Sequence, residues 1–265
     1  MEKTFILFLI CFTNPLLSQT GINSKSTSAV FDAQSQIKNI LNGDYIDSLQ
    51  KIKWKPYTKE QISSSLDGFA YTAIDSVILF EKDNKQFLLV VLRTIEIDLE
   101  SGMDNGLFAP KTLGLALFIE EKNSWKLINL NRTVARTNCV MDLMPVKLFQ
   151  ISKSDFALSL KFWFTAGGGL IAPEYESWFN LSEYEFGQNI FTFYLANSLD
   201  NEKVIEKTIE IKKSADEEFF DFIINTTITS FSNGNQKIKK LPNERYYFDM
   251  LRGVYLLKNN SVLNV

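Results

Sequence analysis

Histidine is missing from all 265 residues of this chain. Its absence excludes Ser-His-Asp and Cys-His catalytic arrangements, the usual zinc sites and the usual general base. Cysteine is almost missing too: Cys11 lies in an N-terminal apolar run, which leaves Cys139 as the one cysteine beyond it and excludes an intramolecular disulfide there. With no histidine to activate it, Cys139 is interpreted as a small buried residue rather than a nucleophile.

Recognisable binding motifs are also missing. We find no phosphate-binding loop and no dinucleotide fingerprint. The 28 basic and 31 acidic residues are nearly balanced, so electrostatics gives no reason to expect a nucleic-acid partner. We therefore expect no cofactor and no metal, and these absences favour a non-catalytic protein over an enzyme.

The N-terminus predicts export. Glu2 and Lys3 precede the apolar run Phe5 to Phe12; a polar break with Pro15 follows, and then Leu16 to Gln19. This is the layout of a secretory signal peptide, and the run is shorter than the ~20 residues of a membrane span. We assign residues 1–20 to a signal peptide with cleavage between Ser18 and Ser24, and we expect a secreted or periplasmic product without a membrane span.

The remaining sequence is typical of a mainly β protein. Short β-rich runs recur between polar turns, as in Phe69 to Glu81 and Phe87 to Leu99; the first half of the latter is apolar on both faces, as in a covered central strand, and its second half alternates. We count about twelve to fourteen such strands. They predict an antiparallel hairpin meander that forms a large sandwich or an incomplete propeller-like array. One or two N-terminal helices should precede it, over 29–41 and 57–66. We expect residues 21–68 to be a helical and connecting segment and 69–265 to be the antiparallel β domain.

The stretch from Phe156 to Leu181 has the clearest alternation. Phe156, Leu158, Leu160, Phe162 and Phe164 should form one core face, and three glycines at 167–169 should bend the chain into a hairpin. The opposite face would gather five residues into a candidate ligand-binding site: Lys161, Trp163, Glu174, Glu176 and Trp178. Two interpretations stay open. The tryptophans form an exposed aromatic platform for a sugar or peptide, or another layer of strands covers this face and they belong to the core.

Three further features carry weaker signals. The loop Asp98 to Lys111 has clustered oxygen donors, but their spacing departs from the helix-loop-helix calcium pattern, which favours a solvated turn. Arg132 and Arg136 follow a predicted strand in a less regular segment, where they bind an anion or merely lie on a loop. Gly114 interrupts a leucine-rich strand and leaves room for a close neighbour.

Three functions compete. The first is a non-catalytic binding or interaction protein whose partner is an unknown extracytoplasmic protein or glycan. The second is a histidine-free carboxylate hydrolase acting on glycans, in which two of the residues Glu174, Glu176, Glu183 and Glu185 would share a cleft. The third is a structural role in cell-envelope assembly, in which exposed strand edges dock a partner.

Overall fold

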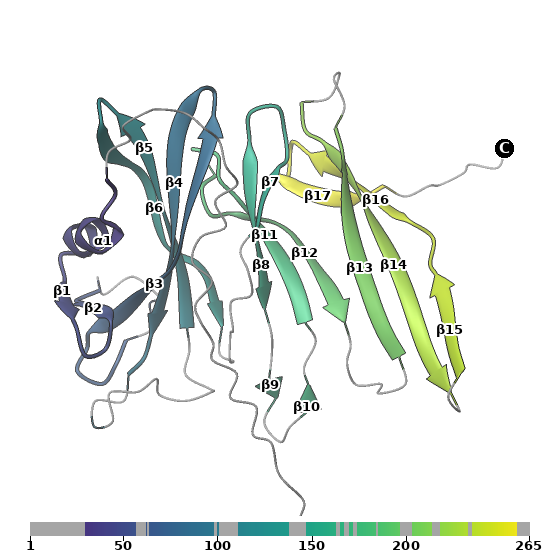
Figure 1. The fold of residues 1–265 in the computed structure, drawn as a ribbon, viewed down its shortest axis with the longest axis horizontal. Helices are drawn as coiled ribbons and strands as arrows, with labels where there is room; N and C mark the ends of the chain where they lie inside the picture. Colours follow the sequence, from purple (N-terminus) through teal and green to yellow (C-terminus); the bar gives the residue numbers. More distant parts are fainter. Residues whose placement is uncertain are drawn as a thin grey trace, which may run out of the picture.

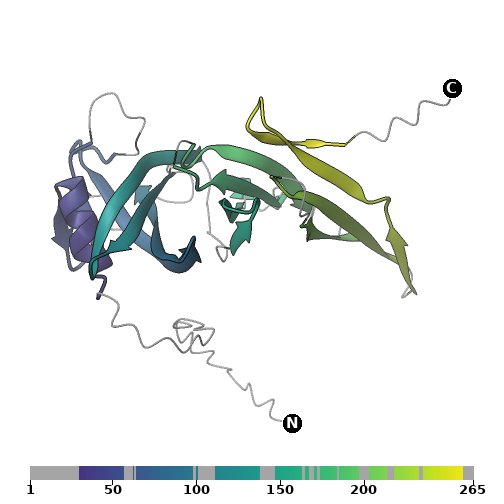
Figure 2. The same ribbon diagram turned by 90° about the horizontal axis from the view of Figure 1, so that it is seen from above.

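The computed structural model describes residues 30–56, 62, 64–97, 100, 111–137, 147–162, 165–166, 170–171, 174–183, 185–196, 203–213, 218–232 and 235–258. These residues form one helix and seventeen strands, nearly all of them in three antiparallel sheets. Figures 1 and 2 show the three sheets following one another along the longest axis of the molecule. The predicted fold class, a mainly β chain of antiparallel hairpins with an N-terminal helix and sandwich-like packing, is confirmed.

The first sheet is a meander of six strands that pair in the order of the sequence. Its long hairpins match the predicted ones, and the polar turns fall at Asp83–Asn84 and Lys122–Asn123, where φ is positive. Two short strands of this sheet lie in the segment that we interpreted as a connector. The six strands are β1 (Asp44–Ile46), β2 (Lys51–Trp54), β3 (Ala70–Lys82), β4 (Lys85–Ile95), β5 (Lys111–Glu121) and β6 (Ser124–Thr137).

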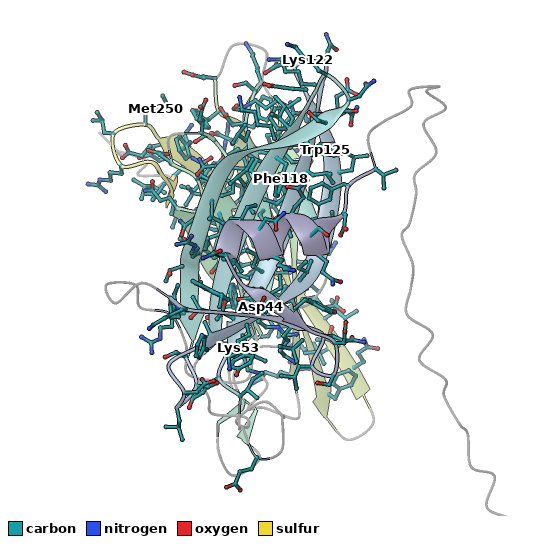
Figure 3. The ribbon with its side chains drawn as sticks, turned by 90° about the vertical axis from the view of Figure 1, so that its left-hand side faces the viewer. Asp44, Lys53, Phe118, Lys122, Trp125 and Met250 are labelled. Atoms are coloured by element: carbon teal, nitrogen blue, oxygen red, sulfur yellow. The ribbon has the colours of Figure 1, made fainter. Side chains whose placement is uncertain are left out.

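Helix α1 (Ala33–Leu41) covers the outer face of the first sheet (Figure 3). The side chain of Asp32 caps it by accepting a hydrogen bond of 3.1 Å from the backbone N–H of Ser35, and Asn42 ends it in the left-handed region. The helix therefore begins later than predicted, because Asp32 provides the cap. Ile37 and Leu41 face the sheet and are buried against it. The second predicted helix lies largely outside the described residues.

The central sheet contains the stretch with the clearest alternation. Strands β8 and β11 pair around the bend, with Tyr175 opposite Phe162 and Phe179 opposite Leu158, so the predicted hairpin is confirmed. The bend itself carries a two-stranded ribbon, and the glycines at 167–169 lie outside the described residues. The strands are β7 (Lys147–Gln150), β8 (Phe156–Phe162), β11 (Glu174–Asn180) and β12 (Asn189–Ala196), with the ribbon β9 (Thr165–Ala166) and β10 (Leu170–Ile171).

The last sheet does not continue the ladder of the central sheet. Its first strand, over 203–212, pairs along its whole length with the strand after it and not with the strand before it. Phe191 and Phe193 of β12 pack against the face of the last sheet, so the chain turns from one sheet into the next at this point rather than extending the ladder. The strands are β13 (Lys203–Lys212), β14 (Asp221–Ser232), β15 (Asn235–Lys240), β16 (Glu244–Asp249) and β17 (Val254–Leu257).

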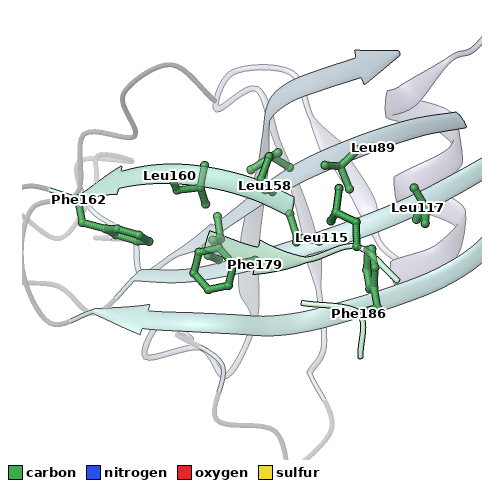
Figure 4. Packing of buried hydrophobic residues seen from close by; sticks show 11 residues of the cluster. Leu89, Leu115, Leu117, Leu158, Leu160, Phe162, Phe179 and Phe186 are labelled. Atoms are coloured by element: carbon green, nitrogen blue, oxygen red, sulfur yellow. The ribbon is translucent and has the colours of Figure 1, made fainter. Parts of the chain in front are cut away.

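The central sheet is buried on both faces. Leucines and phenylalanines of β8 and β11 pack against Leu89 and Leu115 of the first sheet (Figure 4). On the other face, Trp178 and Phe191 pack against Phe222 of the last sheet. Burying large apolar side chains between stacked sheets is the main stabilising contribution in such a fold. No helix in the described part of the chain has the length and apolarity needed to cross a membrane.

Candidate functional site

Trp178, the best described member of the predicted site, lies in the core. Its side chain has 0% exposure and contacts a cluster of aromatic rings, with centroids 4.8 Å away at Phe222 and 4.9 Å away at Phe149. Since the last sheet covers this face of β11, Trp178 cannot stack on a ligand. For this residue the structure supports the alternative interpretation, in which another layer of strands covers the tryptophan.

Glu176 is a buried carboxylate beside Trp178. Its residue exposure is 6%, and its Oε1 accepts hydrogen bonds from the indole N–H of Trp178 at 2.9 Å and from the hydroxyl of Ser159. Hydrogen bonds to buried polar atoms compensate for their lost hydration. Glu176 therefore has a structural role between the central sheet and the last sheet, where a glycan cannot reach it.

The other predicted site residues are only partly placed. Lys161 is partly buried and lies directly opposite Glu176 in the ladder between β8 and β11, so the structure brings these two residues together. Trp163 lies outside the described residues. The backbone of Glu174 is described as the first residue of β11, whereas its side chain is not.

A different site is built where β6 bulges. Two steps along β5, from Leu113 to Leu115, correspond to four along β6, from Ala135 to Asn131. The extra residues fold over Gly114, at which an added Cβ would lie 3.2 Å from the carbonyl oxygens of Asn131 and Arg132. The room predicted at Gly114 is thus taken by the backbone of β6. Bulges of this kind redirect side chains and recur beside functional sites.

The loop after β11 closes over the bulge and is tied to it by two asparagines. The side-chain amide of Asn129 donates to the carbonyl of Glu183 at 2.9 Å, and that of Asn131 donates to the carbonyl of Phe186 at 3.1 Å. Gly187 adopts φ +80°, and an added Cβ would lie 2.8 Å from Asn131 Nδ2. Glycine is therefore required at 187 both for its conformation and for its close approach to β6.

Between the bulge and this loop lies a cavity of about 470 Å³. We call it the bulge cavity. Its position at the edge of β6 makes it reachable from solvent, and the residues that line it include two asparagines, a threonine, an arginine and a glutamate together with one leucine and one phenylalanine. The guanidinium carbon of Arg132 lies 5.5 Å from the centre of the ring of Trp54, which belongs to the core cluster under α1. The lining residues are Asn129, Leu130, Asn131, Arg132, Thr133, Glu183 and Phe186.

A second cavity, of about 450 Å³, lies beside β16 in the last sheet. Glu218 and Asp221 both line it. Asp221 is already engaged, because its Oδ2 accepts from Arg245 Nε at 2.7 Å and from Arg245 Nη2 at 2.6 Å. Among the described lining residues of the two cavities, only Glu183 belongs to the four carboxylates proposed for a hydrolase.

Sequence reasoning flagged part of the bulge cavity and missed the rest. The sequence predicts Arg132 either as an anion ligand or as a loop residue, and Glu183 as one of four candidate carboxylates of a hydrolase. Asn129, Thr133 and Phe186 were missed, because the cavity depends on a bulge and on a loop from the neighbouring sheet. Gly114 was the one available signal, since it showed that something approaches β5 closely.

Some predicted features lie beyond what can be placed. The signal peptide, most of the loop Asp98 to Lys111, and Cys139 fall outside the described residues. Arg136 is exposed near the end of β6, and Arg132 reaches the bulge cavity. Comparison with protein-family models, with curated protein sequences and with solved structures gave no match to this chain.

Proposed function

We propose that this protein is a secreted or periplasmic, non-catalytic binding protein that holds a polar ligand, a sugar unit of a glycan, in the bulge cavity. The observation that carries the proposal is the lining of that cavity. Residues with amide, hydroxyl and carboxylate side chains, from β6 and from the loop residues 181–183 and 185–188, line one open space of about 470 Å³. Such groups hydrogen-bond to the hydroxyls of a sugar, and a cavity of this volume fits one or two sugar units.

The cavity also supports binding over hydrolysis. Hydrolysis of a glycosidic bond by carboxylates needs two of them on either side of the bond, roughly 5–10 Å apart. Glu183 is the one carboxylate among the described lining residues of the bulge cavity. Glu176, the most central of the other candidates, is enclosed between sheets and held by Trp178 and Ser159.

The cavity is held in shape by its own contacts. Asn129 and Asn131 fix the loop from one side, and on the other side the backbone N–H of Asn180 donates to the carbonyl of Gln188 at 2.8 Å. Asn180 also donates through its side chain to Glu185 Oε2 at 3.0 Å. A preformed site loses less conformational entropy on binding, which favours recognition of a small polar ligand.

Screening on an array of oligosaccharides, followed by calorimetric titration of the sugars that bind, tests this function. Glu183→Gln should lower the affinity about tenfold, because hydrogen bonds to a charged acceptor are worth about 1.5–3 kcal/mol. Glu218→Gln is the matched control, since it makes the same change beside the second cavity, and it should leave the affinity unchanged. Binding that Glu183→Gln does not alter, or no sugar bound at millimolar concentration, would reject the proposal.

Export is tested separately. The proposal of a signal peptide over residues 1–20 predicts that the mature protein begins between Ser18 and Ser24. Mass spectrometry of protein recovered from the medium or the periplasm measures that N-terminus. Recovery of an uncleaved chain from the cytoplasm would contradict export without bearing on the cavity.

A further inference from the structure

The last sheet ends in a three-stranded region that combines one apolar and one basic face. It comprises the described residues 203–207 of β13, 226–232 of β14 and 235–240 of β15, and Figure 1 shows β15 as the outermost strand at the end of the molecule opposite α1. Residues paired across strands share a face of the sheet. The pairing register of β13, β14 and β15 therefore shows which side chains lie on the same face of this region.

One face of this region carries four lysines around the pair Ile205 and Ile228. Lys203 pairs with Ser230, which pairs with Lys237, and Ile228 pairs with Lys239. Lys207, opposite Thr226, shares that face. We call these four lysines the lysine face. The chain as a whole has a net charge of −3, so this concentration of lysine is opposite in sign to the rest of the molecule.

The other face is apolar and open to solvent. Val204 pairs with Thr229, which pairs with Ile238, and Phe231 lies at the end of β14. Val204, Phe231 and Ile238 have exposures of 47%, 46% and 60%. Glu206, the one acidic residue among the described residues of this region, lies on this apolar face, in register with Lys240 through Thr227.

The outer edge of β15 lies between these two faces. Within the described part of the chain, β15 pairs with β14 alone, so its other edge presents main-chain donors and acceptors. Such an edge can accept an added strand from another polypeptide. A second copy of β15 is a poor candidate, because three of its six residues are lysines and like charges opposite one another are destabilising.

We propose that the edge of β15 binds an extended acidic segment of another protein by strand addition. The partner segment alternates, with acidic side chains over the lysine face and apolar side chains beside Ile238 and Phe231. The main chain of the partner pairs with β15, which gives affinity, and the alternation of its side chains selects the segment. The partner is a polypeptide rather than a lipid surface, because only a polypeptide pairs with the strand edge.

The probe is a capped octapeptide alternating glutamate and valine, titrated into the full-length mature protein by calorimetry, with hydrogen exchange followed at β15. We expect binding and slower exchange of the β15 amides. The variant Lys237→Glu with Lys239→Glu should bind the peptide at least about tenfold more weakly, because each reversed charge now repels the ligand. Lys85→Glu with Lys122→Glu makes the same change of net charge at the ends of two hairpins of the first sheet and should bind like the unmodified protein.

A second peptide keeps the test decisive even if the charge-reversal variant fails to fold. It has the same sequence with alternate backbone amides methylated, which removes its main-chain donors and keeps its charge. Strand addition predicts that it binds at least about tenfold more weakly. Equal binding of both peptides would overturn the proposal, as would binding to vesicles of anionic phospholipid without binding to the first peptide. Absence of any peptide binding at millimolar concentration would overturn it too.

Discussion

The indole N–H of Trp178 donates a hydrogen bond of 2.9 Å to the carboxylate of Glu176, and both side chains are enclosed between the central sheet and the last sheet. Their alternation in the sequence resembles that of a solvent-facing strand. In the structure Trp178 and Ser159 donate hydrogen bonds to Glu176 on this face, and aromatic rings pack around Trp178. The pair is therefore a structural element of the core.

The first prediction concerns Trp178. Replacing it with alanine should lower the free energy of unfolding by about 3–5 kcal/mol, because the change leaves a large cavity among the rings of Phe149, Phe191 and Phe222. Trp178→Phe should cost less, about 1–3 kcal/mol, because it removes mainly the donor to Glu176. Urea denaturation followed by circular dichroism measures both values. Equal stability of the alanine variant and the unmodified protein would contradict the burial of this residue.

A pair of glycines tests how the bulge cavity is built. Gly187 and Gly68 both have positive φ, of +80° and +76°, but only Gly187 is crowded, by Asn131 and Val134. Both substitutions place a side chain at a positive φ, but only Gly187→Ala adds a steric clash. The free energy of unfolding should therefore be about 1–3 kcal/mol lower for Gly187→Ala than for Gly68→Ala. Thermal or urea unfolding of the two variants measures the difference. Equal losses of stability in the two variants would show that Gly187 is not in close contact with β6.

Alkaline pH should weaken the fold through Tyr246. Burial, together with its hydrogen bond of 3.0 Å to Glu244, raises the pKa of Tyr246 to about 12 from the ordinary value of 10.0. The folded state then holds this proton more tightly than the unfolded state. Its contribution to stability is complete below pH 10.0 and is lost as the pH rises towards about 12. Burial also raises the pKa of Tyr255, which adds to the same trend.

Urea denaturation of the unmodified protein and of Tyr246→Phe, at several pH values from 9 upwards, checks this trend. The variant should lose less stability than the unmodified protein over that range, because its ring cannot ionise. If the two proteins lose stability in parallel, Tyr246 is not a source of the pH dependence.

The ion pair between Asp221 and Arg245 connects β14 to β16. The side chain of Asp221 is 6% exposed, whereas that of Arg245 is 49% exposed. Arg245→Met should cost about 1–3 kcal/mol, because it leaves a buried carboxylate without its cation while the half-exposed arginine limits the loss through solvent screening. The double variant Asp221→Asn with Arg245→Met should recover part of that loss. A double-mutant cycle by urea denaturation gives the coupling energy, and a coupling near zero would mean that the pair contributes little.

Local patterns predicted the strands well because period-two alternation depends on nearby residues. The hairpin from Phe156 to Asn180 follows it closely, whereas in the hairpin from Ala70 to Ile95 the strand β4 is apolar and buried on both faces. Alternation separates the two faces of a strand, but it does not show whether another sheet covers the more polar face. For this reason the sequence allowed two interpretations of Trp178. Burial there depends on Phe222 and Tyr255, which lie far along the chain.

The bulge cavity was harder to predict for a related reason. The segment from Asn131 was expected to be irregular, yet β6 continues to Thr137 with a bulge in the middle. A bulge breaks the alternation that strand prediction relies on, so the strand looks like a loop. The hydrogen bond from Asn131 to Phe186 also joins two sheets, so the sequence of either sheet alone does not predict it.

The strict order of pairing in the first sheet has a consequence for how the chain folds. Each of its strands pairs with its neighbour in the sequence, so this sheet can form from local contacts as soon as residue 137 has been synthesised. The face bearing Leu89, Leu115 and Leu117 would then wait for β8 and β11 to cover it. We expect a folding intermediate that binds hydrophobic dyes and protects the amides of the first sheet early, detectable by pulsed hydrogen exchange. Until residue 181 is available, that intermediate is the form of the chain most exposed to aggregation and most in need of a chaperone.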